Sequence, residues 1–203
     1  MNKTAILLCV FLAAAVTRAY ATPPANDGAS ADARTARGAA IWRQLAQSHW
    51  VAEGASHPET VVYSFTDANC PYCHAFWLAA KYYAKAGLQV RHLMVAVVAP
   101  SSTGKAAAIL QAADPAAALE RHERRFASGG LEPVKPDANT LSVLRENREL
   151  MRKLGLRGTP GLVFRAADGS LRGKSGMPSL ESLPVIFGLP RQEIDDPALQ
   201  RFR

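Results

Sequence analysis

The sequence predicts an α/β fold in which helices cover a central mixed sheet. Three observations support this prediction. A strand, a helix and a second strand follow one another between residues 60 and 98, and such a crossover makes the two strands parallel. Two short strands flank a turn at Asp168-Gly169, and a hairpin makes its strands antiparallel. A long helical insertion, residues 101–154, separates the two units, and a short helix closes the second.

The first 21 residues have the features of a cleavable export signal. Lys3 supplies a positive charge, residues 5–16 form an apolar run that is short for a bilayer span, and Ala19-Tyr20-Ala21 is a cleavage site of the A-x-A kind. We therefore expect the mature chain to begin near Thr22 and to be exported to a bacterial periplasm. Cys9 lies inside the signal and should be removed with it.

Two segments precede the main domain. Residues 22–34 are small, polar and turn-rich, which predicts a flexible leader. Residues 35–58 are predicted to form a linker helix and a turn. The helix extends from Thr35 to about Val51, because apolar residues recur one turn apart, and a stretch with glycine and proline ends it.

The main domain is predicted to span residues 59–189. Its first strand, Thr60–Phe65, is β-branched and aromatic. A helix from Cys70 to about Ala86 follows, with polar residues before it that could cap it and with Pro71 in the first turn, where a missing N–H costs nothing. Residues 88–98 are predicted to form the second strand.

The remainder of the domain is predicted from alanine-rich and β-branched segments. The insertion should be helical apart from breaks at Pro115 and residues 129–136. A hairpin within residues 162–173 and a helix over residues 179–187 follow it. Residues 190–203 are expected to form a loose C-terminal tail.

The composition is that of an ordinary globular protein, with 48% hydrophobic and 20% charged residues. The formal net charge is +7, and a basic chain can bind nucleic acid. The basic residues of the insertion are instead spaced as solvated helix faces, and no nucleic-acid-binding motif accompanies them. We therefore expect no nucleic-acid partner.

The stretch Cys70-Pro71-Tyr72-Cys73-His74 has three interpretations: a redox-active dithiol, a covalent haem attachment site, or half of a zinc site. Once the signal is removed, these two cysteines have no others to pair with. Haem would need His74 and a distant ligand such as Met94, and a sheet over the pair would leave little room for it. Zinc would need further ligands, and the other histidines show no paired spacing. A fixed disulfide in so small a loop would add little stability.

The dithiol interpretation assigns a role to each residue of the stretch. A helix N-terminus favours an anion, so the pKa of Cys70 should lie below the value of about 8.5 for a free thiol. Cys70 is expected to be the more exposed sulfur and the nucleophile, and Cys73, one turn later, to resolve the mixed disulfide. Pro71 and Tyr72 hold the sulfurs at bonding distance and help set the potential, and His74 adds positive character when protonated.

A second motif lies far along the chain. Thr159-Pro160 comes just before the first strand of the hairpin, where the architecture brings a loop beside Cys70. A cis peptide bond at this proline would expose neighbouring backbone groups to a substrate peptide. We therefore predict a substrate-binding loop at Thr159-Pro160.

The stretch VVYSFTDANCPYCHAFW, residues 61–77, resembles the active-site strand and helix of the periplasmic thiol:disulfide interchange proteins of the DsbC/DsbG type. Its CPYC motif is closest to the DsbG branch. The resemblance continues through residues 92–119 and GTPGLVF and covers roughly residues 40 to 188. It implies a thioredoxin fold with a helical insertion, in which Cys70 is the nucleophile, Cys73 the resolving cysteine and Thr159-Pro160 the substrate-side loop.

The resemblance also implies partners. In that family a membrane electron donor keeps the pair reduced, and the pair acts on misbonded or oxidised cysteines of exported proteins, including sulfenic acids in the DsbG branch. Family members carry an N-terminal dimerisation domain before the linker helix, whereas few residues precede that helix here, so we expect a monomer. We expect no cofactor or metal. Three alternatives stay open: a haem-binding electron carrier, a dithiol oxidase acting in the DsbA-like direction, and a non-catalytic adaptor that binds peptides.

Overall fold

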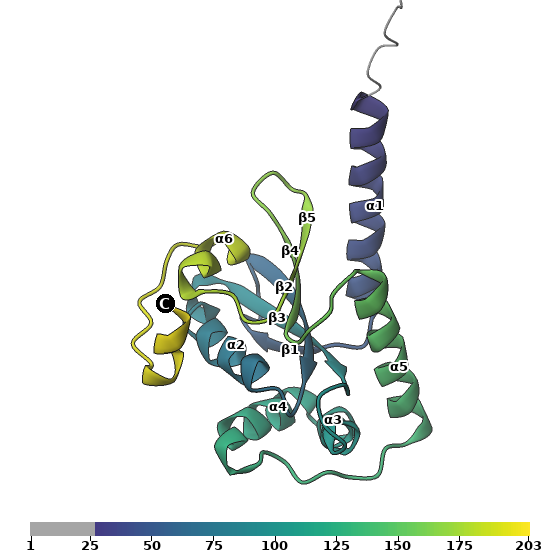
Figure 1. Ribbon diagram of the computed structural model, residues 1–203, viewed down its shortest axis with the longest axis vertical. Coiled ribbons are helices and arrows are strands. Elements are labelled where there is room, and N and C mark those ends of the chain that lie inside the picture. Colours follow the sequence, from purple (N-terminus) through teal and green to yellow (C-terminus); the bar gives the residue numbers. More distant parts are fainter. Residues whose placement is uncertain (1–26) are drawn as a thin grey trace, which may run out of the picture.

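The computed structural model describes residues 27–203; the predicted signal peptide, residues 1–21, and residues 22–26 lie outside the described part. The chain forms a five-stranded mixed sheet with helices on both faces, which confirms the predicted α/β class (Figure 1). Among residues 27–203, every helix is too short or too polar to cross a lipid bilayer.

The elements follow one another in the order that the sequence predicts, with one additional strand at the start. They are α1 (Asp27–Gln47), β1 (Val51–Gly54), β2 (Thr60–Asp67), α2 (Pro71–Lys81), β3 (Leu88–Val95), α3 (Ser102–Leu110), α4 (Pro115–Arg124), α5 (Ala138–Lys153), β4 (Gly161–Arg165), β5 (Leu171–Ser175) and α6 (Leu183–Phe187), with short 3-10 turns η1 (Ala84–Ala86), η2 (Phe126–Ser128), η3 (Leu180–Ser182) and η4 (Pro197–Phe202).

The sheet has the strand order β1-β3-β2-β4-β5. β2 and β3 are parallel, as the crossover through α2 requires, and Ser64 on β2 lies opposite His92 on β3. β4 is antiparallel to β2, with Leu162 opposite Ser64, and β5 is antiparallel to β4. The central strand β2 therefore carries the dithiol helix at its end and has the second motif, at the start of β4, on its other side.

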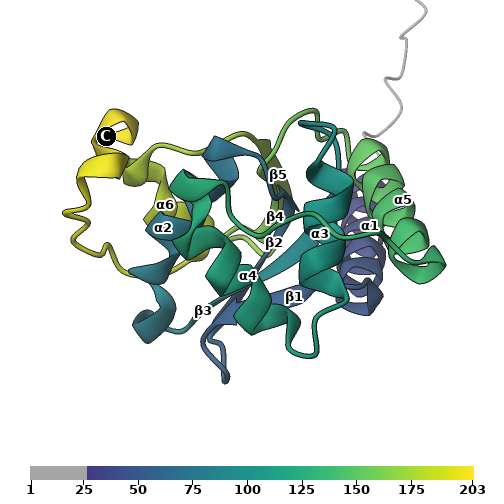
Figure 2. The ribbon, with the colours of Figure 1, turned by 90° about the horizontal axis from the view of Figure 1, so that it is seen from below.

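Different helices cover the two faces of the sheet (Figures 1 and 2). α1 and α5 pack on one face around Leu45, Phe65 and Leu150. α2 and α6 pack on the other face around Phe76 and Phe187. α3 and α4, from the insertion, pack against each other and against β3 and β1 respectively. This first part of the insertion therefore lies at the edge of the sheet next to the start of α2.

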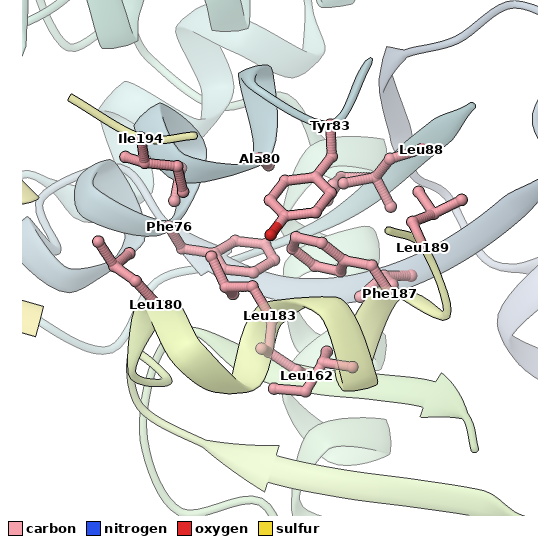
Figure 3. Packing of buried hydrophobic residues seen from close by; sticks show 14 of the residues in the cluster. Phe76, Ala80, Tyr83, Leu88, Leu162, Leu180, Leu183, Phe187, Leu189 and Ile194 are labelled. Atoms are coloured by element: carbon pink, nitrogen blue, oxygen red, sulfur yellow. The ribbon is translucent and has the colours of Figure 1, made fainter. Parts of the chain in front are cut away.

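The aromatic core beneath α2 fixes the position of that helix (Figure 3). Phe76 on α2 is fully buried and meets the ring of Phe187 on α6 at 6.0 Å, and Tyr83 meets Phe187 at 4.8 Å in an edge arrangement. Removing a buried aromatic ring of this kind costs about 3–5 kcal/mol. These buried rings therefore hold the inner face of α2 in place along most of the helix.

The N-terminal segments differ from the prediction in two ways. α1 begins at Asp27, so residues 27–34 belong to a helix and not to a flexible leader. Residues 51–54, assigned to the end of the linker helix and its turn, form the edge strand β1, which pairs with β3. The physical reason is that β1 satisfies the N–H and C=O groups that β3 would otherwise leave unpaired at its outer side.

The C-terminal tail also differs from the prediction. Residues 190–203 are packed against the domain rather than loose: Ile194 and Leu199 are buried in the core beneath α2, and η4 lies beside α2 (Figure 1). Burying these two apolar side chains offsets the entropy of ordering the segment.

The two tryptophans near the linker pack against the domain. Trp42 on α1 meets the ring of Tyr63 edge-on at 4.9 Å. The guanidinium of Arg91 lies 4.3 Å from the ring centre of Trp50.

Candidate active site

α2 begins at the dithiol, and Cys70 is its N-cap residue. The backbone of Cys70 is extended, with φ −86° and ψ 113°, and its sulfur accepts the N–H of Cys73 at 3.3 Å. Pro71 occupies the first turn, where no N–H is needed. A sulfur, rather than one of the upstream polar side chains, therefore satisfies one of the free N–H groups in the first turn of the helix.

The loop before β4 lies against Cys70. The Thr159–Pro160 peptide bond is cis, and the thiol of Cys70 donates to the carbonyl oxygen of Thr159 at 3.3 Å. β4 begins immediately afterwards at Gly161, which pairs with Phe65 on β2. The register of the sheet thus brings together two motifs that are 89 residues apart in the sequence.

Both thiols are free and buried, with 3% of Cys70 and 2% of Cys73 exposed. The sequence predicts Cys70 to be the more exposed sulfur, and the difference in exposure lies in this direction but is very small. Instead the two thiols differ in acidity. The hydrogen bond from the Cys73 side chain, helped by Thr159 and by nearby backbone N–H groups, lowers the pKa of Cys70 from 9.0 to about 6, although burial opposes the shift.

Cys73 is shifted in the opposite direction. Burial, the hydrogen bond to Cys70 and the charge of Cys70 raise its pKa well above 9.0. At neutral pH the pair therefore consists of one thiolate, on Cys70, and one thiol, on Cys73. A thiolate is the nucleophilic form of cysteine, so only Cys70 is ready to attack.

A buried carboxylate holds the turn before the dithiol. Asp67, which is fully buried, accepts the N–H of Asn69 at 2.8 Å and the hydroxyl of Ser102 at 2.7 Å through one oxygen. Its other oxygen accepts the N–H groups of Val97 at 2.6 Å and Val98 at 2.9 Å. These two N–H groups leave the sheet to reach Asp67, which is why β3 ends at Val95 and not at Val98 as predicted.

Two adjacent residues of α4 hold the dithiol segment from both ends. His122 donates through Nε2 to the carbonyl of Ala68 at 2.7 Å and accepts the N–H of Leu131 through Nδ1 at 3.0 Å. Burial lowers the pKa of His122, in agreement with a neutral ring in this tautomer. The carboxylate of Glu123, 2% exposed, lies 2.8 Å from Nδ1 of His74. The insertion therefore fixes residues on both sides of the CPYC motif.

Sequence reasoning did not assign Asp67, His122 or Glu123 to the site. The sequence treats His122 as isolated, because its partner Ala68 is 54 residues away and contributes only a backbone carbonyl. Glu123 is one of several charged residues on a helix that looks fully solvated. The one sequence feature that could have indicated a role in the site is the pair His122-Glu123, an acidic residue next to a histidine in an otherwise alanine-rich insertion.

His74 is enclosed by aromatic rings. It stacks on Phe126 at 4.5 Å between ring centres and lies almost parallel to Trp77 at 5.9 Å. For haem to attach to both cysteines with His74 as axial ligand, the porphyrin would have to displace the Thr159 loop and this stack. The residues around the dithiol therefore do not fit a haem group.

Residues 47–184 match the family model described as a thioredoxin-like domain, and the chain belongs to this family. It is similar to the thiol:disulfide interchange protein DsbG of Pseudomonas aeruginosa, at 37% identity over 150 residues, which are 73% of this chain and 59% of that protein. It is also similar to DsbG of Escherichia coli, at 36% identity over 74% of this chain and 62% of that protein. These matches confirm the resemblance to the DsbC/DsbG proteins. The chain spans about three fifths of the length of each of these two DsbG relatives.

The fold is also similar to that of solved structures. The catalytic domain of ScsC from Proteus mirabilis superposes with a TM-score of 0.62 at 26% identity, over 75% of this chain and 95% of that domain. A periplasmic thioredoxin-like protein from Salmonella enterica has a TM-score of 0.55 at 20% identity, over 72% of this chain and 93% of that one. At this identity the similarity shows only that the two chains share a fold. The predicted thioredoxin-like fold is confirmed.

Proposed function

We propose that the chain is an exported thiol–disulfide oxidoreductase of the DsbG-like kind. It would act in the periplasm on proteins that carry disulfides or oxidised cysteines. The observation that carries this proposal is the opposite acidity of two sulfurs one helical turn apart, with the pKa of Cys70 at about 6 and that of Cys73 raised. The similarity to two DsbG proteins supports the same reaction class.

In the first step Cys70 is the nucleophile. Its thiolate attacks one sulfur of a client disulfide, and the bond between the two client sulfurs breaks. The other client sulfur leaves as a thiolate and takes a proton from solvent. Cys70 is then joined to the client in a mixed disulfide, and we propose that the backbone of the Thr159-Pro160 loop pairs with the client backbone.

In the second step Cys73 resolves the mixed disulfide. The charge of Cys70 is one cause of the raised pKa of Cys73, and this charge disappears once Cys70 is bonded to the client. Cys73 can then lose its proton and attack the sulfur of Cys70, which releases the client sulfur as a thiolate. Two electrons have moved from the pair to the client, and Cys70 and Cys73 form a disulfide.

The remaining residues of the motif support these steps. Pro71 and Tyr72 set the geometry of the turn between the sulfurs. His74, held by Glu123, anchors the first turn of α2. Repeated turnover needs an external dithiol to reduce the pair again, and we propose a membrane thiol–disulfide electron donor for this role. If the freed client thiolate instead attacks another client disulfide, that disulfide breaks and releases a different client thiolate. This thiolate can attack the client sulfur of the mixed disulfide, which forms a new client disulfide and releases Cys70 as a thiolate, so the client is isomerised without net electron transfer.

The proposal is tested by following the reduction of a small disulfide by the dithiol form of the purified protein. We expect the wild-type chain to reduce one disulfide per protein and the Cys70→Ser variant to be inactive. A Cys70→Ser protein that reduces the substrate at the wild-type rate would contradict the assignment. Ser142→Ala, a change at an exposed serine on α5, serves as a control and should react normally.

The direction of the reaction in the cell needs a separate measurement. Acid quenching of cells followed by alkylation reports whether Cys70 and Cys73 are reduced or joined in a disulfide. We propose that the pair is largely reduced, as an isomerase or reductase requires. A fully oxidised pair would instead assign the chain to the oxidase direction.

A further inference from the structure

The C-terminal segment is held firmly against α2. Leu199 of η4 is fully buried, and the carboxylate of Asp196 accepts the N–H of Ala198 at 2.8 Å at the start of η4. The guanidinium of Arg203 donates to the carbonyl of Ile194 at 2.7 Å. The hydroxyl of Tyr82, at the end of α2, donates to Asp195 at 2.9 Å. The position of η4 relative to α2 is therefore set by several contacts.

This segment reaches the residue between the two cysteines. The ring of Phe202 meets the ring of Tyr72 edge-on at 6.2 Å between centres. The guanidinium of Arg201 lies 5.7 Å from the centre of the Tyr72 ring and 4.7 Å from that of Phe202, within the range of cation–π contacts. Tyr72 is 49% exposed, so these three side chains form a surface next to the dithiol.

The surface, defined as Tyr72, Arg201 and Phe202, combines two aromatic rings with a cation. Arg201 is exposed, and among residues 33–203, whose side chains the structure describes, no carboxylate lies within 4.0 Å of its guanidinium. The nearest acidic residues in the sequence, Asp195 and Asp196, are occupied by Tyr82 and by the N–H of Ala198. An arginine that contacts an aromatic face keeps its N–H groups, which lie in the plane of the guanidinium, available for a carboxylate.

We infer that this surface binds the client segment next to the attacked cysteine and that Arg201 makes the site prefer segments with an acidic residue there. The inference rests on the proposed function, because it names the class of substrate for the same site. The rings supply contact area that tolerates many apolar side chains, and the guanidinium supplies charge selectivity. The excess of basic over acidic residues in the chain acts in the same direction at longer range.

The test uses two disulfide-linked peptides that differ only by Glu or Lys two residues from the cysteine. The measured quantity is the ratio of exchange rates for the Glu and Lys peptides, which cancels any general loss of activity or folding. For an exposed charge pair we expect a ratio on the order of threefold in the wild type. The ratio should fall toward unity in Arg201→Gln, reverse in Arg201→Glu and persist in Arg201→Lys. Raising the salt concentration should also reduce it.

A matched control separates the local effect from the total charge. Arg148 is exposed on α5, on the other face of the sheet, and Arg148→Glu changes the net charge by the same amount as Arg201→Glu. We expect Arg148→Glu to keep the wild-type ratio. Equal rates for the two peptides in the wild type, or an equal change of the ratio in both variants, would overturn the inference. If the wild type exchanged with neither peptide, the proposed function would fail instead.

Discussion

Cys70 and Cys73 lie one helical turn apart and are buried to the same degree, yet their acidities are shifted in opposite directions. Cys70 sits at the N-cap, where the side chain and N–H of Cys73 stabilise a thiolate. Cys73 lies inside the first turn, where burial and the neighbouring charge disfavour one. The difference teaches that the hydrogen-bond partners and the surroundings of each sulfur atom, more than the exposed fraction of the residue, decide which sulfur is the nucleophile.

The strongest test of this comparison removes each sulfur in turn. Cys70→Ser should abolish exchange, whereas Cys73→Ser should leave the attack intact and remove its resolution. We therefore expect the Cys73→Ser variant to accumulate mixed disulfides with clients, visible as reducible high-mass bands on non-reducing gels. Mixed disulfides in Cys70→Ser and none in Cys73→Ser would reverse the assignment of the two sulfurs.

The pH dependence of alkylation sharpens the comparison. The pKa of Cys70 is lowered to about 6, so its thiolate form grows as the pH rises and is nearly complete above that value. Alkylation of Cys70 in the reduced protein should therefore increase about tenfold per pH unit below the pKa and level off above it. Cys73, with its raised pKa, should stay unmodified over the same range. Peptide mapping by mass spectrometry separates the two sites.

A smaller effect is expected from changing the partner of the thiolate. The side chain of Cys73 makes the largest contribution to the low pKa of Cys70. Cys73→Ala removes this hydrogen bond, so the pKa of Cys70 should rise toward 9.0, while Cys73→Ser keeps a donor and should raise it less. The thiolate absorbance in the ultraviolet measures both. An unchanged pKa in Cys73→Ala would leave the helix terminus as the main cause.

The smallest expected effect on the two sulfurs comes from Asp67. Asp67→Asn places an amide where Val97 and Val98 donate N–H groups, so it should lower the free energy of unfolding by about 2 kcal/mol. The pKa of Cys70 should stay close to its wild-type value, because the carboxylate of Asp67 is not among the groups that shift it. Asp137→Asn is the control: this exposed carboxylate caps α5, and asparagine caps as well, so denaturation should be nearly unchanged.

Much of the fold could be predicted because its signals are local. The β-branched strand before Cys70, the proline in the first turn of α2 and the turn at Asp168-Gly169 each indicate their structure over a few residues. The edge strand β1 was missed because four residues, Val51–Gly54, carry too little pattern and depend on pairing with β3. The ordered tail was missed because the burial of Ile194 and Leu199, which distinguishes it from an unstructured end, depends on tertiary packing.

The cysteines and the cis-proline loop were likewise found from short motifs. The contacts around them were not, because Asp67, His122 and Glu123 act through backbone groups and side chains that are distant in the sequence. The small exposed fraction of Cys70 could not be predicted for the same reason. Thr159 lies over its sulfur only once the sheet has formed.

The ordered C-terminus has a practical consequence for anyone producing the protein. Arg203 follows directly after Phe202, whose ring touches Tyr72. A purification tag fused at this end would begin next to the dithiol, where a polyhistidine or acidic sequence could compete with incoming peptides. Recombinant versions are therefore better tagged ahead of α1, which extends away from the sheet (Figure 1).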